Sequence, residues 1–497
     1  MISLICANIY IQFTDPDLMK YCFPKDFIWG TATSAFQTEM GTSKDSISDS
    51  SDWYVWVHDK DNIKSGLVSG DLPENGDDFW NLYKTDLDNA KSLNNNSIRL
   101  SIDWARIFKK PTFEIKARVR KEKGLSVEVS LTDNDINSLE DLADINAVKH
   151  YNEIFTYAKS LGLKVLLTLY HWPLPAWLHD PIKCQRDMEN CTKKGWLDET
   201  TIIEYAKYVE YATRHFSKDV YMWETINEPE VIAFQGYIFG NVSGFPPGLS
   251  NISTGFVALK NLALANNIAM KIIKKNDPGK PAGVGTNPSY YESYSNDRKS
   301  RELTQYIKYL NNFWFLNAAV YGDFDLDLDG KGDLRIDSIT SPDYIGIDYY
   351  RRMKIQPKNI SGDISIYNSD VMPCNDCTDF MWDIYPAGIR SVVLENYQEY
   401  KKPIYILENG IADATDSKRT IYMVSHLKEL SKAINDDSLP VKGYYHWSLI
   451  DNYEWARGFS MKFGLYAVNY ETKKRMMRKS AKVYTKICRD NGVDENQ

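Results

Sequence analysis

Short, β-rich apolar runs alternate with longer amphipathic stretches along the whole chain of 497 residues. Such alternation of strands and helices is typical of a parallel sheet with helical crossovers. Eight units without a Gly/Ser-rich linker predict one α/β domain, a single (β/α)8 TIM barrel with loop insertions, rather than an open doubly wound sheet. The predicted strands are residues 27–33, 97–102, 164–170, 220–226, 281–286, 344–350, 403–408 and 442–447.

The barrel is expected to occupy residues 21–490, with two polar insertions at about 109–146 and 351–380. We expect the first insertion to cross one face of the barrel. Residues 1–20 form an N-terminal extension of unknown role, because this apolar start lacks the basic region and cleavage site of a signal peptide and is too short to span a bilayer. Residues 491–497 are expected to be a C-terminal tail.

The composition excludes some classes of partner. The net charge is −8 and no basic run is present, so a nucleic-acid partner is not expected. No segment is apolar over the length that a membrane span requires. Aromatic residues make up 13% of the chain. This share suits a protein that stacks aromatic rings on a ligand, although a large core is the alternative interpretation.

Seven cysteines form an odd set, in which only Cys184/Cys191 and Cys374/Cys377 are close pairs. The second pair, in CNDC, would need two further ligands to bind zinc. We therefore expect reduced thiols and a cytoplasmic protein, with no metal and no cofactor.

DLDLDG, beginning at Asp325 and followed by Asp333, resembles the start of a calcium loop. The twelfth position is Ile336 instead of a bidentate Glu, so a solvated acidic turn is the favoured interpretation.

In a barrel of this kind, functional residues collect at the C-terminal ends of the strands. WETINEPE at 223–230 holds three glutamates there. Glu224 should lie roughly 13 Å further down the wall than Glu228, at about 3.3 Å per strand residue, outside a small site. Glu230 should lie in the loop beyond Pro229. Pro229 should hold Glu228 in an extended conformation at the barrel mouth, and Glu408, which ends the strand YILE, is its predicted partner.

Two carboxyl groups facing each other across an aromatic-lined mouth are suited to cleavage of a glycosidic bond. One must hold a proton for the leaving oxygen while the other stays ionised. Taken singly, the neighbouring strand-end residues also have structural interpretations. His171 alone would more often be a structural histidine, Trp172 and Trp447 could belong to the core, and Arg99 needs a buried anion.

Several long motifs resemble glycoside hydrolase family 1, in particular its archaeal β-glycosidases, between about residues 23 and 488. TINEP resembles the acid/base motif, ILENG the nucleophile motif and FIWGTATSAFQTE the N-terminal signature. YHWPLPAWLHDP resembles the segment after the third strand, and HWSLIDNYEWARGFSMKFGLYAVNY the C-terminal signature. VSGDLPENG and VSGFPPG carry the archaeal resemblance.

The resemblance implies a retaining double displacement with Glu228 as acid/base and Glu408 as nucleophile. Asn227 would contact the sugar 2-hydroxyl, and Glu454 the 4- and 6-hydroxyls. The other residues that the resemblance implicates would bind the sugar or support the nucleophile: Gln37, His171 and Trp455 at the 3- and 4-hydroxyls, Trp447 as the stacking floor, and Arg99 and Tyr350 at Glu408.

Three residues depart from the family pattern. Asp348 stands where Asn is usual and Leu407 where Thr is usual, while Glu224 occupies a position where apolar or small residues are common. An ionised Asp348 would raise the pKa of Glu408, or Asp348 would itself stay protonated, which predicts an acidic pH optimum. For Glu224 the one available account is a salt bridge to the helical layer.

The sequence thus predicts an exo-β-glycosidase that releases terminal glucose or galactose from a β-glycoside or oligosaccharide. The alternatives are a transglycosylase that uses the same intermediate and a non-catalytic sugar-binding protein. The sequence does not define the oligomeric state, although related enzymes are often tetrameric and a homo-oligomer is compatible with it.

Overall fold

The computed structural model describes residues 21–495 and shows eight parallel strands that close into a barrel, with β16 pairing with β2. The predicted TIM barrel is therefore confirmed, and each barrel strand overlaps one of the eight predicted runs. In their order round the barrel, the strands are β2 (Ile28–Ala32), β3 (Ser97–Ser101), β6 (Lys164–Tyr170), β7 (Val220–Asn227), β8 (Ala282–Thr286), β12 (Tyr344–Asp348), β15 (Ile404–Asn409) and β16 (Val441–Trp447).

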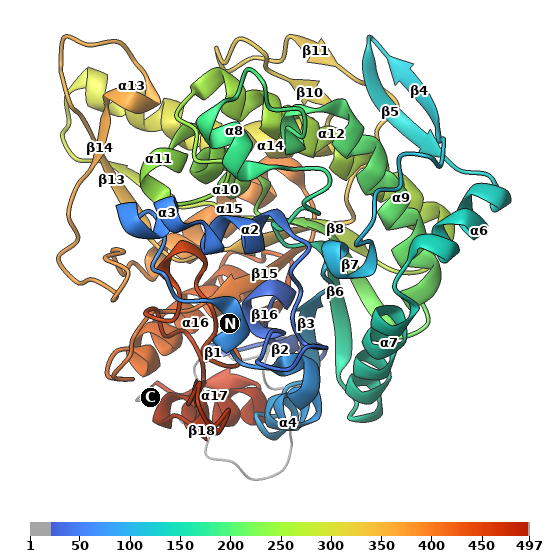
Figure 1. Cartoon of the computed structure of the whole chain (residues 1–497). Coiled ribbons are helices and arrows are strands. Elements are labelled where there is room, and N and C mark those ends of the chain that lie inside the picture. Colours follow the sequence, from blue (N-terminus) through green and yellow to red (C-terminus); the bar gives the residue numbers. More distant parts are fainter. Residues whose placement is uncertain (1–20, 496–497) are drawn as a thin grey trace.

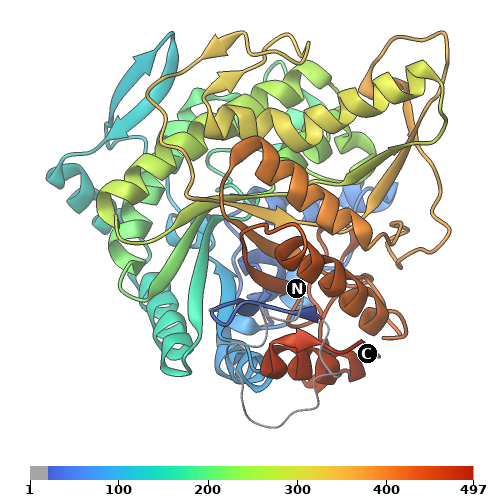
Figure 2. The same ribbon diagram turned by 180° about the vertical axis from the view of Figure 1, so that it is seen from behind.

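The barrel strands are buried almost throughout, and helices cover the outside of the barrel (Figures 1 and 2). Strands buried on both faces read as continuous apolar runs, which is why they were recognisable in the sequence. The long outer helices are α4 (Phe79–Ser92), α7 (Ile145–Ser160), α9 (Glu199–Phe216), α12 (Ile252–Asn276), α15 (Ala387–Tyr400), α16 (Arg419–Asn435) and α17 (Lys479–Asp490).

The expectation that no segment is apolar over the length of a membrane span is wrong for one outer helix, because α12 is long and apolar enough by length and hydropathy. It packs against α9, β7 and β8, and 83% of its most apolar 18-residue window is buried inside the protein. The apolar surface of α12 is therefore explained by packing on the barrel.

Both predicted insertions contain regular structure outside the barrel (Figure 1). The first holds the antiparallel hairpin β4 (Arg118–Glu122) and β5 (Leu125–Ser130), followed by α6 (Asp133–Leu142). In the second, β13 (Arg352–Pro357) lies between β14 (Ser369–Val371) and β9 (Tyr290–Ser293) in a small sheet.

The two ends of the described chain pair with each other. β1 (Tyr21–Cys22) forms an antiparallel pair with β19 (Gly492–Val493). The segment 491–497 is thus not simply a tail, because its first residues complete a short ribbon. The predicted extension, residues 1–20, lies outside the described residues.

The expectation of reduced thiols is wrong for four of the cysteines. Cys184 is bonded to Cys191, and Cys374 to Cys377. In each pair the chain turns back between the two residues, which brings their Sγ atoms together in a way that the spacing alone does not show. The bond between Cys374 and Cys377 also removes both sulfurs of CNDC as thiolate ligands for zinc.

The acidic turn at 325–333 is less solvated than predicted. Asp325 is buried, and its carboxylate accepts hydrogen bonds from the Tyr309 hydroxyl at 2.7 Å and the backbone N–H of Gly330 at 2.9 Å. Asp327 and Asp333 place carboxylate oxygens within 4.8 Å of it but are exposed. Asp325 thus has an internal structural role in holding this turn.

Candidate active site

The predicted site residues lie together at the C-terminal ends of the barrel strands. Arg99 is on β3, Asn227 ends β7 and Glu228 follows it directly, and Glu408 is near the end of β15. His171 comes directly after β6, Tyr350 shortly after β12, and Trp447 ends β16. Parallel strands of a barrel direct these ends to one mouth, so residues far apart in sequence share one site.

Glu228 and Glu408 face each other closely in the barrel mouth. Both are buried, and an oxygen of one lies within 4.8 Å of an oxygen of the other. Carboxyl groups about 5 Å apart are typical of retaining glycosidases, whereas inverting enzymes need about 6.5–9.5 Å to admit a water. The spacing therefore favours direct attack by one carboxylate on the sugar.

The backbone at Glu228 is not extended as predicted. Its φ of 46° and ψ of 59° place it in the left-handed region, at the N-cap of the short helix α10 (Pro229–Ala233). Pro229 is the first residue of this helix, where its fixed φ suits a helix start. A non-glycine residue in this region costs about 1–3 kcal/mol, and such residues concentrate at functional sites. The turn into α10, rather than an extended strand, aims Glu228 at the mouth.

Glu230 and Asn287 hold Glu228 from the side of β8. Glu230 does not lie in a loop but in the first turn of α10, buried, where it accepts a hydrogen bond from the backbone N–H of Asn287. The side-chain Nδ2 of Asn287 donates to Oε1 of Glu228 at 2.5 Å. Sequence analysis missed Asn287, although it follows a predicted strand directly, the same signal that identified His171.

Arg99 is the hub of the buried polar network. Its Nε and Nη2 donate to the two oxygens of Glu224 at 2.7 and 2.8 Å. Nη2 also donates to Oδ1 of Asn227 at 2.5 Å, and Nη1 pairs with Glu408. Thr168 completes the network by donating to Glu224 at 2.6 Å. The predicted buried anion of Arg99 is therefore a pair of glutamates, one of them the strand-end Glu408.

The predicted salt bridge between Glu224 and the helical layer is wrong. Glu224 points into the barrel and meets Arg99. The register shifts between Glu224 and Asn227, because Glu224 lies opposite Gly283 of β8 but Asn227 lies opposite Gly285. Three steps along β7 thus match two along β8, and this irregularity brings the two residues to the same guanidinium.

The environments of the two strand-end glutamates differ. Burial and the nearby charge of Glu408 raise the pKa of Glu228 well above its ordinary value. Burial also raises the pKa of Glu408, but Arg99 opposes this, as does Tyr350, whose hydroxyl donates to Oε2 at 2.6 Å. The contacts that Arg99 and Tyr350 make with Glu408 thus favour the charge on Glu408 and the proton on Glu228.

His171 is a neutral donor at the side of the mouth. Burial and Arg99 lower the pKa of His171 well below its ordinary value. Its Nε2 lies 3.2 Å from Nδ2 of Asn227, which can only donate, because Oδ1 of the same amide accepts from Arg99. The ring proton must then be on Nδ1. Within the described residues Nδ1 has no hydrogen-bond partner, so it is available to a ligand hydroxyl.

Aromatic rings line the same side of the mouth. The ring planes of Trp447 and Trp455 each lie within 13° of that of His171, with centroids 6.1 Å away. Trp172 packs against Trp455 at 4.4 Å and donates its Nε1–H to the backbone oxygen of Asn227 at 3.1 Å. Trp172 is thus a packing residue that also fixes the end of β7.

Gln37 and Glu454 form a polar pair beside these rings. Gln37 lies on α1 (Ala35–Thr38), and its Nε2 donates to Glu454 at 3.3 Å and to the backbone oxygen of Tyr453 at 3.0 Å. The Ser34 hydroxyl donates to the other end of the same amide at 2.6 Å. These contacts orient both side chains before any ligand arrives.

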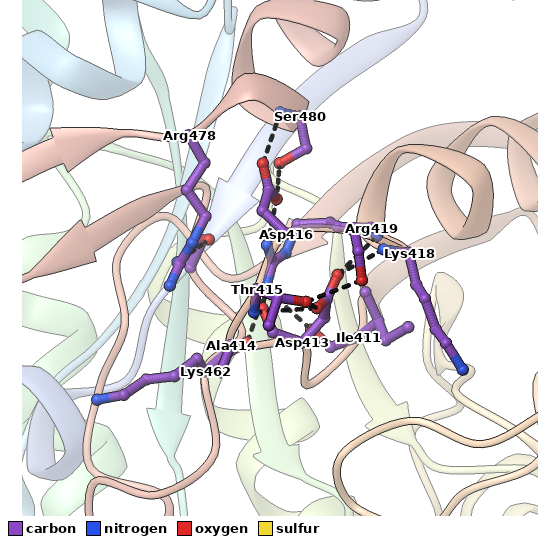
Figure 3. Close-up of polar contacts among 12 residues, drawn as sticks. Ile411, Asp413, Ala414, Thr415, Asp416, Lys418, Arg419, Lys462, Arg478 and Ser480 are labelled. Carbon is purple, nitrogen blue, oxygen red and sulfur yellow. Dashed lines mark hydrogen bonds and ion pairs between the residues drawn. The ribbon is translucent and has the colours of Figure 1, made fainter.

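A second polar network fixes the loop that follows Glu408 (Figure 3). Asp413 accepts a hydrogen bond from the backbone N–H of Arg419 at 3.0 Å at the start of α16. The Arg419 guanidinium donates to the backbone oxygens of Asp413 and Lys462 at 2.7 Å each, and pairs with Asp416. Asp416 in turn accepts from the backbone N–H of Ser480 on α17 at 3.0 Å. The loop after β15 is therefore anchored to α16 and α17.

Gly410 shows how closely the neighbouring strand end approaches this loop. A Cβ at Gly410 would collide with the backbone oxygen of Trp447. Glycine is needed here because β15 and β16 must bring Glu408 and Trp447 to the same mouth.

The chain is similar in sequence and in fold to known proteins over nearly their whole length. A β-galactosidase of Saccharolobus solfataricus is 37% identical over 483 residues, which cover 96% of each chain. The crystal structure of the β-glycosidase from Thermosphaera aggregans superposes with a TM-score of 0.88 at 36% identity, over 96% of this chain and 98% of that one. A β-glucosidase mutant derived from a hyperthermophilic tetrameric structure superposes with a TM-score of 0.85 at 38% identity, over 96% of this chain and 97% of that one.

The sequence profile of glycosyl hydrolase family 1 matches residues 19–136 and 137–493. This match spans both halves of the barrel and all the strand-end residues described above. The chain therefore belongs to glycosyl hydrolase family 1.

Proposed function

We propose that the protein is a retaining exo-β-glycosidase that releases terminal β-linked glucose or galactose. The observation that carries this proposal is the spacing of Glu228 and Glu408, whose nearest oxygens are within 4.8 Å of each other. That spacing suits a covalent route through a glycosyl-enzyme ester.

In the first step, Glu228 donates its proton to the glycosidic oxygen while the Glu408 carboxylate attacks the anomeric carbon. The bond to the leaving group breaks and an ester to Glu408 forms. Arg99 and Tyr350, both bonded to Glu408, orient it for this attack. In the second step, Glu228 takes a proton from water as the water oxygen attacks the anomeric carbon, and Glu408 is released as a carboxylate.

The same residue can serve as acid and then as base because its pKa changes between the two steps. The charge on Glu408 contributes to the raised pKa of Glu228. When Glu408 becomes an ester, that charge disappears, so the pKa of Glu228 falls and its carboxylate can accept the proton of water.

The sugar would lie between the two glutamates and the aromatic wall. We assign the unpartnered Nδ1 of His171 to a ring hydroxyl, and Asn227 to the 2-hydroxyl next to the ester. The remaining contacts follow the position of each side chain at the mouth: Trp447 as the stacking floor, and Gln37, Glu454 and Trp455 at the hydroxyls furthest from the ester.

The stereochemistry of the first product tests the double displacement. We expect NMR spectra of the hydrolysis of nitrophenyl β-glucoside and β-galactoside to show the β-anomer first, followed by mutarotation. Immediate appearance of the α-anomer would contradict the covalent route. Rates of hydrolysis of nitrophenyl β-mannoside and β-fucoside, compared with those of the β-glucoside and β-galactoside across pH, would define the sugar preference.

The variant Glu228→Gln separates the two steps. For a nitrophenyl glycoside, whose leaving group needs little help from an acid, ester formation should persist while its hydrolysis slows by about 10²–10⁴-fold. We expect a burst of nitrophenol followed by a slow steady state, measured by stopped-flow absorbance. Azide should accelerate turnover and give a β-glycosyl azide. An unchanged steady-state rate would contradict the assignment of Glu228.

We further propose that the protein is a soluble homo-oligomer. The structural relative derived from a tetrameric enzyme supports the second part. The predicted cytoplasmic location rested on reduced thiols, and the two disulfides argue instead for a compartment in which such bonds persist.

A further inference from the structure

Four carboxyl groups surround a single guanidinium in the closed end of the site. Arg99 and Glu224 are fully buried, as is Asp348, and Glu228 and Glu408 are each only 4% exposed. A buried charge is costly unless it is paired with an opposite charge. Which of these carboxyl groups hold a proton therefore depends on which of them contact Arg99.

The guanidinium of Arg99 is already committed elsewhere. It binds Glu224 through two hydrogen bonds at 2.7 and 2.8 Å, binds Asn227 and pairs with Glu408. Glu224 fits beside Arg99 because the residue that faces it is Gly285. A Cβ at Gly285 would collide with Oε1 of Glu224. One glutamate, Glu224, thus already balances the positive charge of Arg99, and Glu408 is a second glutamate that shares the same cation.

Asp348 has no such partner. Its two side-chain oxygens are buried and make no hydrogen bond within the described residues. One oxygen lies within 4.8 Å of an oxygen of Glu228 and of Glu408, and Asp348 is the register partner of Glu408 on β15. The charged and titratable groups facing it are Arg99 on β3, Glu224 on β7, Glu228 directly after β7, Glu408 on β15 and the Tyr350 hydroxyl beyond β12.

We propose that Asp348 is a positioning residue that holds a proton throughout the catalytic cycle, and that this proton allows Glu408 to be the ionised member of the group. This inference rests on the roles proposed for Glu228 and Glu408. An Asp348 carboxylate would stand beside at least one like charge without a cation of its own. A protonated one adds no charge and matches the size of an asparagine.

The proton on Asp348 is compatible with both chemical steps. Before attack Glu408 is ionised and Glu228 is neutral. In the ester intermediate Glu408 is neutral and Glu228 is ionised. Asp348 therefore always faces one negative glutamate, and the net charge of the group stays constant.

The proposal sets the direction of the pH dependence. Burial, then the charge of Glu408, raise the pKa of Asp348 well above its ordinary value. At low pH two protons are shared by Glu228, Asp348 and Glu408, and the productive state has them on Glu228 and Asp348. When the pH rises and the group loses one of these protons, activity falls whenever the remaining proton lies on Asp348 or Glu408 instead of Glu228. Activity is then favoured on the acid side and lost as the pH rises.

The variant Asp348→Asn removes one competitor for the proton and keeps the shape of the side chain. We expect the alkaline limb of the kcat/KM–pH profile to move up by about one unit or more, while the acid limb stays in place. As a control, Asp325→Asn neutralises a buried aspartate of the acidic turn at 325–333 and should keep the wild-type profile. Both profiles should be measured with and without EDTA, because a divalent cation held by the three carboxylates could supply the neutralising charge in place of the proton.

An unmoved alkaline limb in Asp348→Asn would overturn the proposal, and so would a wild-type profile that EDTA changes. Loss of activity at every pH in a folded Asp348→Asn would also overturn it, because a carboxyl group would then be required in its own right.

Two readouts do not depend on hydrolysis. The infrared difference spectrum between wild type and Asp348→Asn at neutral pH should contain the carbonyl band of one protonated carboxyl, and this band should shift with ¹³C-labelled aspartate. The melting temperature of Asp348→Asn relative to wild type should rise with pH, because a group with a raised folded-state pKa loses its stabilising contribution as the pH increases. If no glycoside is hydrolysed at any pH, the proposed function fails while these two readouts still decide the protonation of Asp348.

Discussion

Glu408→Gly should abolish hydrolysis of nitrophenyl β-glucoside, and azide or formate should restore part of the activity with an inverted product. We expect a loss of at least about 10⁴-fold, the scale seen when a residue that forms the covalent intermediate is removed. The glycine leaves a space bordered by Arg99 and the Tyr350 hydroxyl, the two groups that now contact the carboxylate. A small anion in that space can attack the anomeric carbon from the same face, and the α-glycosyl product is identified by NMR.

A matched control is Glu408→Gln. The amide is as large as the carboxylate, so it leaves no space for an external anion and its activity should not be restored by azide. Both variants should bind a non-hydrolysable sugar analogue, which calorimetry would show. Full activity of Glu408→Gly, or a rescued product with retained configuration, would contradict the role of Glu408.

The barrel and its two strand-end glutamates were predictable because their signals are local. Each barrel strand is buried on both faces and reads as an apolar run, and the strand ends share one mouth in this fold. Glu228 and Glu408 follow such runs directly, so the sequence alone placed them opposite each other. The overall family assignment rested on motifs that are contiguous in the chain.

The sequence does not predict the position of a side chain correctly where that position depends on contact with another segment of the chain. Glu224 was misplaced because a regular strand was assumed, whereas the register of β7 shifts against β8 just beyond it. Glu228 was expected to be extended because the effect of Pro229 was considered without the helix that begins there. Asn287 was not predicted because its role depends on its hydrogen bond to Glu228. The two residues follow neighbouring strands, β8 and β7, and the sequence does not show this contact.

These corrections change the interpretation of Arg99. From the sequence, Arg99 was expected to be a support of the nucleophile. In the structure Arg99 pairs with two glutamates, Glu224 and Glu408, and it donates two hydrogen bonds to Glu224. Arg99 therefore holds the closed end of the barrel together as well as supporting Glu408, and its removal should affect stability and catalysis by separate routes.

Arg99→Met should destabilise the protein by about 3–5 kcal/mol, because it leaves Glu224 and Glu408 buried without a cation. The loss should grow with pH. Without Arg99 the folded-state pKa of Glu408 rises further above its unfolded value, so the folded protein binds more protons and becomes less stable as the pH rises from about 4. Denaturant titrations at about pH 5 and about pH 8 would measure this difference.

The double variant Arg99→Met/Glu224→Gln separates the two roles of the guanidinium. Neutralising Glu224 removes the carboxylate that Arg99 binds through two hydrogen bonds, so much of the lost stability should return. Activity should not return, because Glu408 still lacks its cation and holds a proton over more of the pH range. Recovery of both stability and activity in the double variant would show that Arg99 acts only as the partner of Glu224, and that Tyr350 suffices to keep Glu408 ionised.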